Sequence, residues 1–588
     1  MFETFAMDCA MTRTSDVPGQ AGTANRLFEE AVAAHGRLSS SDAERLYRMA
    51  LRLDPGHPEA LNNLGALRER ADDAIEAERC YRAALQRAPD YVDARYNLGL
   101  LLHGNRQFAE AEDCYRRVIA AMPGHVAAHV YLAGLLQDTD RAAEAEWSYR
   151  HAMSLDPGDA VAHHGLGLLF VAIGRASEGE VYLRDALRLA PDLKDAAGAL
   201  GALLHRQQRY TEAEVLYRRV LELDPGSVKA LNNLGRLLHD AGRLTEAERY
   251  LREALAAAPE RAPTAFNLSL VLLAMGRYEE GWALYEARYV ESAHWGDDAH
   301  CHVRPALRFP EWRGQPLAGK SMVVWAEQGL GDCVQFARYL PVLKAQGASR
   351  LTLVCPRTLC RLLQTLEGVD ACVPNDDASH LAEHDYACML MSLPLHAGTT
   401  FATLPADVPY LRVSYAQAAR WRRRISAGGF RVGLVWAGDP RPDMPGASAI
   451  DRRRSLSAAA LLPLLDVRGA TFVSLQKGEA ARSQMAGIPA GLRPLDPMAE
   501  VDDFADTAAI ISTLDIVITA DTSVAHVAGA LGKPVWILCR FDGCWRWLDG
   551  RDDSPWYPSA RLFRQETPGD WTRVIERVRT ALQRQVLA

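Results

Sequence analysis

The stretch DIVITADTSVAHVAGALGKP, residues 515–534, decides the fold of the second half of this chain. Its first five residues are rich in β-branched side chains and predict a short buried strand. Asp521-Thr522-Ser523 are residue types that commonly cap a helix, and we expect that helix to end near Leu531, before Gly532. Residues 535–538 predict the next strand. A strand, a helix and a strand in this order indicate a parallel α/β sheet.

The start of that predicted helix is a candidate ligand site. In β-α-β units, ligands lie at the carboxyl ends of the strands. A helix N-terminus there offers free N–H groups and about half a positive charge, which suits a phosphate. His526 lies four residues after Thr522, so both can face the same ligand. The alternative, a capped helix that carries a buried histidine, is equally compatible with this spacing.

Length and composition limit the classes of protein. The chain has 588 residues, too many for one core, and a net charge of −8 without a long basic run, which argues against nucleic acid as a partner. No run of 18 apolar residues predicts a membrane span. The 11 cysteines show no CxxC pair and indicate a reduced, cytoplasmic protein. Residues 1–21 lack the apolar core of a secretory signal, and we expect a disordered leader there.

Residues 22–293 repeat with a period of 34. Proline recurs in one register, at Pro55, Pro89, Pro123, Pro157, Pro191, Pro225 and Pro259. Small residues four positions before large ones recur in the same register, as in Ala77 and Tyr81. This is the tetratricopeptide (TPR) pattern of two antiparallel helices per repeat, in which the small residue lets the helices approach. We therefore expect an all-α TPR superhelix of about eight repeats, with the first and last degenerate.

One column of the array would line its concave face. It precedes a repeating leucine and reads Asn63, Asn97, Tyr131, Gly165, Ala199, Asn233 and Asn267. An asparagine amide can donate to and accept from an extended peptide backbone at once. The column resembles the asparagine ladder of the O-GlcNAc transferases, which implies acceptor binding by its four asparagines, although the middle three positions depart from the ladder. The alternative is that these asparagines help the first helix of each repeat to pack.

The second half predicts two α/β layers after a linker. Residues 294–319 lack a helical period and form a linker or docking segment, and the aromatic end of the array, residues 281–289, is expected to dock on this second half. Strands alternate with helices over 320–416 and 417–588, which predicts two Rossmann-like domains facing a cleft. The break in period also suggests separable modules, with a cut near Arg304.

A Gly-rich turn, residues 328–332, comes after the first strand of this half. It is neither a full GxGxxG nor a P-loop, and no apolar-flanked Asp-x-Asp metal pair occurs. Phosphate charge would then be met by helix termini and by Lys477, Arg452 and Arg454, with no metal or other cofactor. A lysine after a strand is also often only solvated.

Two short motifs carry a family resemblance. Gly331-Asp332 and Asp521-Thr522-x3-His526-x-Ala528 resemble the glycosyltransferase family that contains the bacterial lipopolysaccharide heptosyltransferases (family 9-like). Longer phrases at 325–339 and 553–557 are similar to its bacterial TPR-linked branch, which includes flagellin glycosyltransferases. The resemblance covers residues 22–585 and implies a GT-B fold, a sugar-nucleotide donor in the C-terminal half, and metal-independent inverting transfer.

The resemblance also implies roles for residues. Asp332 matches the presumed catalytic base, although it is equally suited to cap a helix from Cys333, and Glu327 is a weaker candidate. His526 would act with it by handling the leaving phosphate. The residues implied at the donor site are Trp436, Gly438, Gln476, Lys477, Asp521, Thr522 and Ser523. Trp436 could stack on a base or sugar or face the core. Ser523 stands where heptosyltransferases usually have glycine, so the donor's identity is not implied.

We therefore expect a cytoplasmic glycosyltransferase that moves a sugar from a nucleotide donor to a hydroxyl of a protein acceptor, with flagellin as one candidate, recruited by the TPR array. Two alternatives stay open. One is a catalytically inactive TPR/GT-B scaffold. The other is a glycan or lipopolysaccharide transferase that uses the repeats for complex assembly. Oligomerisation through the array is compatible with all three.

Overall fold

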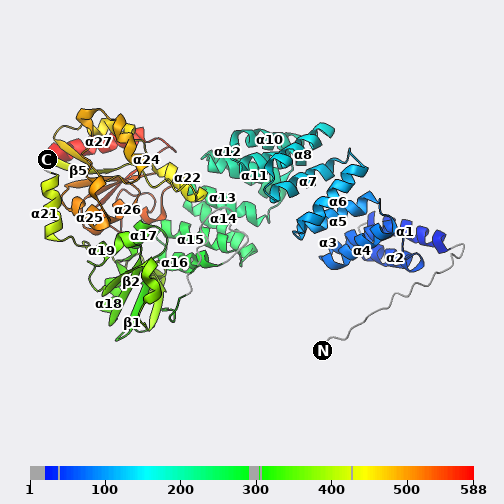
Figure 1. Cartoon of the computed structure of the whole chain (residues 1–588), viewed down its shortest axis with the longest axis horizontal. Helices are drawn as coiled ribbons and strands as arrows, with labels where there is room; N and C mark the ends of the chain where they lie inside the picture. The colour runs from blue at the N-terminus through cyan, green and yellow to red at the C-terminus, as the bar shows by residue number, and fades with distance from the viewer. Residues whose placement is uncertain (1–19, 37–39, 291–303, 305–306, 426–427, 588) are drawn as a thin grey trace. The chain divides into compact units, whose positions relative to one another are not determined.

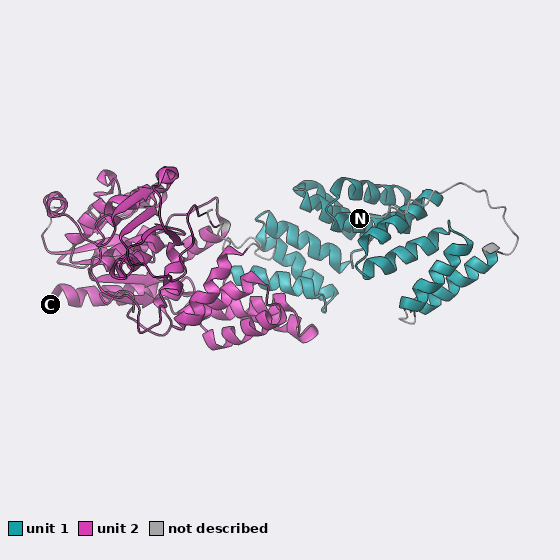
Figure 2. Ribbon diagram, turned by 90° about the horizontal axis from the view of Figure 1, so that it is seen from below, with its two compact units in different colours: residues 1–207 teal, residues 208–588 magenta. Residues whose placement is uncertain are grey.

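The computed structural model describes residues 20–36, 40–290, 304, 307–425 and 428–587. The leader expected at residues 1–21 lies outside these, apart from its last two residues, which belong to a helix. The chain forms two compact units, residues 1–207 and 208–588 (Figure 2). The second unit therefore begins inside the repeat array. No helix among the described residues is long and apolar enough to cross a membrane.

The described part of the first unit consists of antiparallel helix pairs, followed by α11, which is the first helix of the next repeat. They are α1 (Gln20–Gly36), α2 (Ser40–Leu53), α3 (Pro58–Arg70), α4 (Ala74–Arg87), α5 (Val92–Gly104), α6 (Phe108–Ala121), α7 (Val126–Asp138), α8 (Ala142–Leu155), α9 (Ala160–Ala172), α10 (Ala176–Leu189) and α11 (Lys194–Arg206). The repeat continues in the second unit with α12 (Tyr210–Leu223), α13 (Val228–Asp240), α14 (Leu244–Ala257), α15 (Ala262–Ala274), α16 (Tyr278–Tyr285) and the 3₁₀ turn η1 (Glu286–Tyr289). The predicted all-α repeat is confirmed.

A left-handed residue between the two helices of a repeat makes each tight turn. It has a positive φ at Asp72, Arg106, Asp140, Gly174, Gln208, Gly242 and Gly276, again every 34 residues. After α3, the N–H of Asp73 donates to the carbonyl of Arg68 and that of Asp72 to Glu69, which is the Schellman arrangement of a helix C-terminus. The turn therefore satisfies the last carbonyls of one helix while it starts the next.

Small residues allow the helices of a repeat to approach, as the sequence predicts. A Cβ on Gly65 would lie 2.7 Å from Cε1 of Tyr81, a ring with no exposed surface. The same contact recurs between Gly99 and Tyr115, where the distance would be 2.8 Å. The glycine at this position is therefore required by the aromatic ring of the second helix.

Two parallel sheets follow the array in the second unit (Figure 1). The first has the order β3-β2-β1-β4 and comprises β1 (Ser321–Trp325), β2 (Arg350–Cys355), β3 (Ala371–Pro374) and β4 (Tyr386–Met389). The second has the order β6-β5-β7-β8-β9 and comprises β5 (Phe430–Val435), β6 (Ala470–Ser474), β7 (Ile516–Ala520), β8 (Val535–Cys539) and β9 (Ala560–Arg564). The α/β class with parallel sheets is confirmed.

Short helices connect these strands. They are α17 (Leu330–Phe336), α18 (Tyr339–Ala345), α19 (Arg357–Leu363), α20 (Leu393–His396), α21 (Tyr415–Arg424), α22 (Pro445–Arg454), α23 (Leu462–Leu465), α24 (Glu479–Arg482), α25 (Phe504–Ser512), α26 (Ser523–Ala530) and α27 (Thr572–Leu587). The helix expected from Cys333 is part of two helices, α17 and α18, because the chain turns at Ala337 and Arg338. The Arg338 side chain is buried there and donates from Nε to the Gln335 carbonyl at 2.9 Å.

The end of the array docks on the α/β part, as predicted. Trp282 is buried, and its ring meets Trp545 edge-on at 5.3 Å and Phe336 at 5.8 Å. One continuous core contains Phe266, Trp282 and strand β1. This core runs across the predicted boundary, so a cut near Arg304 would divide it, and the separability of the two modules stays a prediction.

The docking segment also joins the first sheet. Of residues 294–319, the structure describes residue 304 and residues 307–319. The backbone N–H of Trp312 donates to the Ala387 carbonyl, and the backbone N–H of Ala387 donates to the Pro310 carbonyl, both at 2.8 Å. This segment therefore pairs with the edge of β4.

Candidate functional site

The predicted site residues lie at the carboxyl ends of strands in both sheets. The Gly-rich turn follows β1, Gly438 follows β5, Lys477 follows β6 and Asp521 follows β7. The helices that start after β1 and β7, α17 and α26, pack on each other. The site is therefore built where the two α/β layers meet.

Asp332 lies at the third position of α17. This helix begins at Leu330, with Gly329 at its N-cap, so the expectation that Asp332 caps a helix from Cys333 is wrong by one turn. The Gly329 N–H donates to Asp332 Oδ2 at 2.9 Å, which fixes the carboxylate from the turn before it. Oδ2 of Asp332 therefore stabilises the start of α17, and Oδ1 is left to contact another residue.

That other oxygen, Asp332 Oδ1, pairs with Arg546 Nη2. Arg546 is buried, and its Nε donates to Gln335 Oε1 at 3.0 Å. Burial acts to lower the pKa of Arg546, but the Asp332 carboxylate raises it above its ordinary range. No sequence motif pointed to Arg546, because it lies 214 residues away in the short 3₁₀ helix η8 (Trp545–Trp547), outside any periodic segment.

His526 is buried in α26, with 4% of its surface exposed. Its Nδ1 lies 3.1 Å from the Tyr557 hydroxyl, and its ring stacks on Trp547 at 5.4 Å between ring centroids. Burial lowers the pKa of His526 to about 4. The imidazole is therefore neutral at pH 7, which corresponds to the buried-histidine alternative. Contact with a phosphate would require the residues around it to move.

Gly331 brings α17 and α26 into contact. A Cβ at this position would lie 2.8 Å from Cδ2 of His526 and 3.5 Å from Cα of Ser523. The expected cleft between the two Rossmann-like halves is therefore closed at this point, because a residue without a side chain lets the two helices touch. The close approach also places Asp332, the next residue, near the N-terminus of α26.

The two longer phrases of the family resemblance pack together. Arg338, from the first phrase, donates through Nη1 to the carbonyl of Trp556 at 2.7 Å, and its guanidinium lies 4.6 Å from the ring centre of Tyr557. Phe336 meets the Trp556 ring edge-on at 5.5 Å. These phrases build the contact between the two α/β layers, a structural role that their sequence alone did not indicate.

A second set of charges surrounds Gly438. Arg454 Nη1 donates to the carbonyl of Asp521 at 2.9 Å, and its Nη2 pairs with the buried carboxylate of Asp451. A Cβ on Gly438 would lie 2.8 Å from Nε of Arg454, so only glycine leaves room for this guanidinium. Arg454 thus links the loops after β5 and β7. Arg452 donates instead to Ser448 Oγ at 3.0 Å, within its own helix.

Three other predicted donor residues hold the loops in place. Trp436 is fully buried in the core of the second sheet, which is its core-facing alternative. The Gln476 side chain accepts from the N–H groups of Trp436 and Ala437, at 3.0 Å each. Lys477 Nζ donates to the carbonyl of Val501 at 2.7 Å. Gln476 and Lys477 therefore hold the backbone of neighbouring loops in place. Their contact with a sugar-nucleotide donor stays a prediction.

The start of α26 has the geometry of the predicted helix N-terminus. Thr522 is its N-cap residue, and its hydroxyl lies 3.3 Å from that of Thr519 without capping the helix. Ser523 is the first helical residue, and Asp521, Thr522 and Ser523 are all half-buried. Asp521, Thr522 and Ser523, which the sequence predicts to lie around a phosphate, are therefore accessible from solvent at the N-terminus of α26.

The asparagines of the array are bonded to one another. In the first unit, Asn97 Nδ2 donates to Asn62 Oδ1 at 2.9 Å, and Asn63 Nδ2 to the Tyr47 hydroxyl at 3.3 Å. In the second unit, Asn267 Nδ2 donates to Asn232 Oδ1 at 3.0 Å, and Asn233 Oδ1 accepts from Asn232 at 3.4 Å. Asn63, Asn97, Asn233 and Asn267 are half-buried. These bonds support the packing alternative, and acceptor binding stays a prediction.

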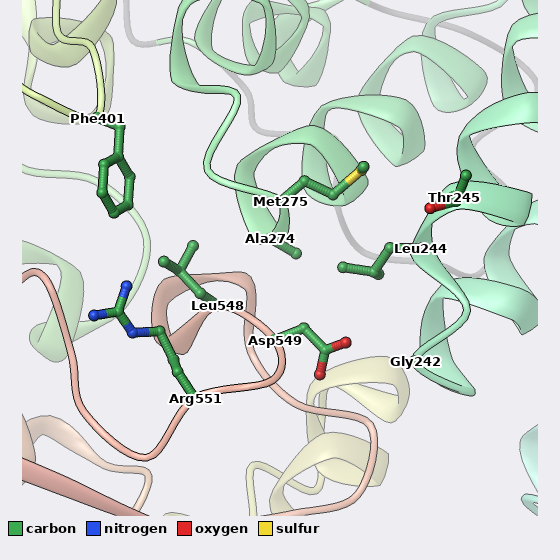
Figure 3. Close-up of a pocket in the computed structure, with 9 residues that line it drawn as sticks. All are labelled: Gly242, Leu244, Thr245, Ala274, Met275, Phe401, Leu548, Asp549 and Arg551. Carbon is green, nitrogen blue, oxygen red and sulfur yellow. The ribbon is translucent and has the colours of Figure 1, made fainter.

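A hollow of about 470 Å³ lies apart from these residues, within the second unit. Gly242 and Met275 of the array and Phe401, Leu548 and Arg551 of the α/β part line it (Figure 3). No group of three or more His, Cys, Asp or Glu side chains placed to hold a metal ion occurs among the residues that the structure describes.

Comparisons with known proteins identify the repeats. Residues 57–123 and 194–260 match one tetratricopeptide repeat model, and residues 104–160 and 232–294 match a second. Among curated proteins, Protein FlbA of Caulobacter vibrioides is 30% identical over 338 residues, which are 53% of this chain and 53% of FlbA. The chain thus spans about half the length of this curated relative.

Solved TPR structures show weaker likeness. A tetratricopeptide repeat protein from Parabacteroides merdae gives a TM-score of 0.37 at 17% identity, covering 43% of this chain and 100% of that one. YrrB, described as a TPR protein with an unusual peptide-binding site, gives 0.26 at 21% identity, covering 29% and 89%. With TM-scores below 0.5, these likenesses carry no argument about function.

Proposed function

We propose that this chain is a glycosyltransferase that moves a sugar from a nucleotide-activated donor to a hydroxyl of a protein recruited by its TPR array. The observation that carries the proposal is the meeting of a carboxylate and a helix N-terminus at the carboxyl ends of two parallel sheets. Gly331 brings Asp332 next to the start of α26, so a base and a phosphate-binding element lie close together.

Each residue has a role in this proposal. Asp332 takes the proton of the acceptor hydroxyl, and Thr522 and Ser523 at the start of α26 receive the phosphate of the leaving nucleotide. Arg454, which spans the loops after β5 and β7, stabilises the charge that develops there. His526 is a buried positioning residue between the two layers. TPR arrays generally bind polypeptide segments, which supports a protein acceptor, with flagellin as the candidate that the family resemblance suggests.

The inactive scaffold remains a second candidate, because one observation favours it. The charged groups nearest the proposed site, Asp332 and Arg454, already have partners within the chain, in Arg546 and Asp451. An enzyme must free or share at least one of these charges when substrates bind, whereas a scaffold need not.

The test is to incubate the full chain with UDP-, GDP-, ADP- and CMP-sugars and candidate acceptors, and to detect both free nucleotide and glycosylated protein. Asp332→Asn should lower turnover by about 10²- to 10⁴-fold, the usual range for losing a general base, because an amide cannot take a proton. Nucleotide affinity should change little, since the other sheet holds the donor.

Asp385→Asn is the matched control, since Asp385 pairs with Lys320 at the amino ends of β1 and β4, at the opposite edge of the sheet from the proposed site. Its turnover should equal that of the wild type. Near-normal turnover of Asp332→Asn would remove Asp332 from this role, and no release of nucleotide from any sugar donor would favour the scaffold.

A further inference from the structure

The loop that carries Asp332 is fixed from the array. Glu327, just before the Gly-rich turn, is 7% exposed and accepts from Arg288 Nη2 at 3.2 Å and from the Tyr289 hydroxyl at 2.6 Å. The Arg288 side chain has no exposed surface. Burial acts to lower the pKa of Arg288, but Glu327 and its neighbours raise it above its ordinary range. A buried charge pair of this kind holds its two segments together, because separating them leaves an unpaired charge.

The next residue is also held by the array. Gln328 has a φ of 62°, a left-handed conformation that side-chain-bearing residues seldom adopt. Its Nε2 donates to the Tyr285 hydroxyl at 2.8 Å. Gln328 directly precedes Gly329, the N-cap of α17, so this bond fixes the point at which the helix of Asp332 begins.

Trp282 and Tyr285 of the array also support Arg546, the partner of Asp332. Trp545, adjacent to Arg546, meets Trp282 edge-on at 5.3 Å and Tyr285 at 6.3 Å. The Arg546 guanidinium lies 4.3 Å from the ring centre of Trp545. Residues 282–289 therefore contact both loops that supply the Asp332–Arg546 pair.

We propose that the end of the TPR array is part of the frame of the active site, with Tyr285 and Arg288 as positioning residues for Asp332. This inference rests on the proposed function. It assigns the last repeat a task besides acceptor recruitment, which is to hold the base-bearing turn at a fixed distance from Arg546. Loss of the Tyr285–Gln328 contact or of the Arg288–Glu327 contact should then slow the chemical step without weakening the binding of the sugar nucleotide.

The experiment compares two phenylalanine variants of the full chain. Tyr285→Phe removes only the hydroxyl that binds Gln328. Tyr278→Phe is the matched control, since Tyr278 lies in the same helix, is equally buried and has a hydroxyl that faces Trp556 and not the turn that carries Asp332. Arg288→Lys is a third variant, which keeps the charge but loses the forked geometry.

Two measurements apply to each variant. The first is hydrogen–deuterium exchange of the peptide 326–336, which requires no substrate. It should become about tenfold faster or more in Tyr285→Phe, because the lost hydroxyl accepts from Gln328 Nε2 at 2.8 Å and donates to Gln328 Oε1 at 3.1 Å, and stay unchanged in Tyr278→Phe. The second is turnover, in which kcat should fall about tenfold in Tyr285→Phe while the KM for the sugar nucleotide changes less than twofold.

The outcomes separate the two proposals. Wild-type exchange and wild-type kcat in both Tyr285→Phe and Arg288→Lys would overturn the positioning role and leave the enzyme proposal intact. Faster exchange in Tyr285→Phe, in a chain whose wild type transfers no sugar, would overturn the enzyme proposal while supporting the restraint of this turn by the array. A parallel rise in KM would assign Tyr285 to binding and also overturn the inference.

Discussion

Gly331 is the residue on which the candidate site depends most directly. Without a side chain, it allows α17 to touch His526 and the start of α26. His526 in turn bonds to Tyr557 and stacks on Trp547, so this histidine connects the first sheet's helix to the last segments of the chain. Burial at this contact lowers the pKa of His526 and so favours the neutral form of the imidazole.

The buried state of His526 predicts a pH dependence of stability. Its pKa is lowered from 6.5 to about 4, so the unfolded chain takes up a proton as the pH falls through 6.5 and the folded chain does not. The free energy of unfolding should therefore decrease between pH 6.5 and 4, by roughly 3 kcal/mol in total from this one group. In His526→Gln, this part of the pH dependence of the free energy of unfolding should be absent.

Urea unfolding at pH 7 and pH 4.5 measures the effect. Tryptophan fluorescence reports mainly the second unit, because 11 of the 12 tryptophans follow residue 208. His380→Gln, at an exposed histidine, is the control and should keep the wild-type difference between the two pH values. An equal pH dependence in His526→Gln and the wild type would contradict the buried neutral state.

At the scale of the element, the repeats from α3 onward join their helices by the same left-handed turn, and several of them couple to the repeat before through an arginine. Arg141 bonds to Glu112 at 2.7 Å, and Arg175 to Glu146 at 2.9 Å, each pair 29 residues apart. Such half-exposed pairs contribute little energy individually, so the register depends mainly on the packed small and large residues.

Two helix glycines of the first unit should respond oppositely to alanine. A Cβ on Gly165 would lie 2.4 Å from Cε1 of Tyr149, a ring that is only 5% exposed, so Gly165→Ala should destabilise by about 1–3 kcal/mol. A Cβ on Gly198, inside α11, would meet nothing within 4 Å. Gly198→Ala should therefore stabilise by about 0.5–1 kcal/mol.

Thermal unfolding followed by circular dichroism compares the two variants with the wild type. Changes of the same sign would show that Tyr149 is not the reason for the glycine at position 165.

At the scale of the whole molecule, the boundary between compact units does not coincide with the boundary between fold classes. The last repeats belong to the second unit, and the Trp282 ring is part of the same core as β1. A fragment of residues 208–588 should therefore fold, whereas a fragment of residues 304–588 should expose the rings of Trp545 and Phe336 that Trp282 covers.

Thermal melting and binding of the dye ANS distinguish these fragments. The longer one should melt cooperatively with little dye binding, and the shorter one should bind dye and aggregate. Cooperative melting of residues 304–588 without dye binding would support the separable modules that the break in sequence period suggests.

Local patterns account for much of what was predictable in this chain. The 34-residue period of proline, leucine and glycine specifies the helix pairs, because each repeat presents the same contacts to its neighbour. The β-branched run at residues 515–519 and the glycine and proline after the next helix specify β7, α26 and β8 within a residue or two. These signals lie within a few residues of the elements they define.

The pairing of segments far apart in the chain was not predictable. Asp332 meets Arg546 across 214 residues, and Arg338 meets Trp556 across 218, while neither partner stands in a periodic segment. The burial of His526 and Trp436, and the inclusion of the last repeats in the second unit, likewise depend on which surfaces pack together. A spacing motif specifies where a side chain stands on its own element, whereas its charge partners, its exposure to water and hence its pKa are set by the segments that fold against it.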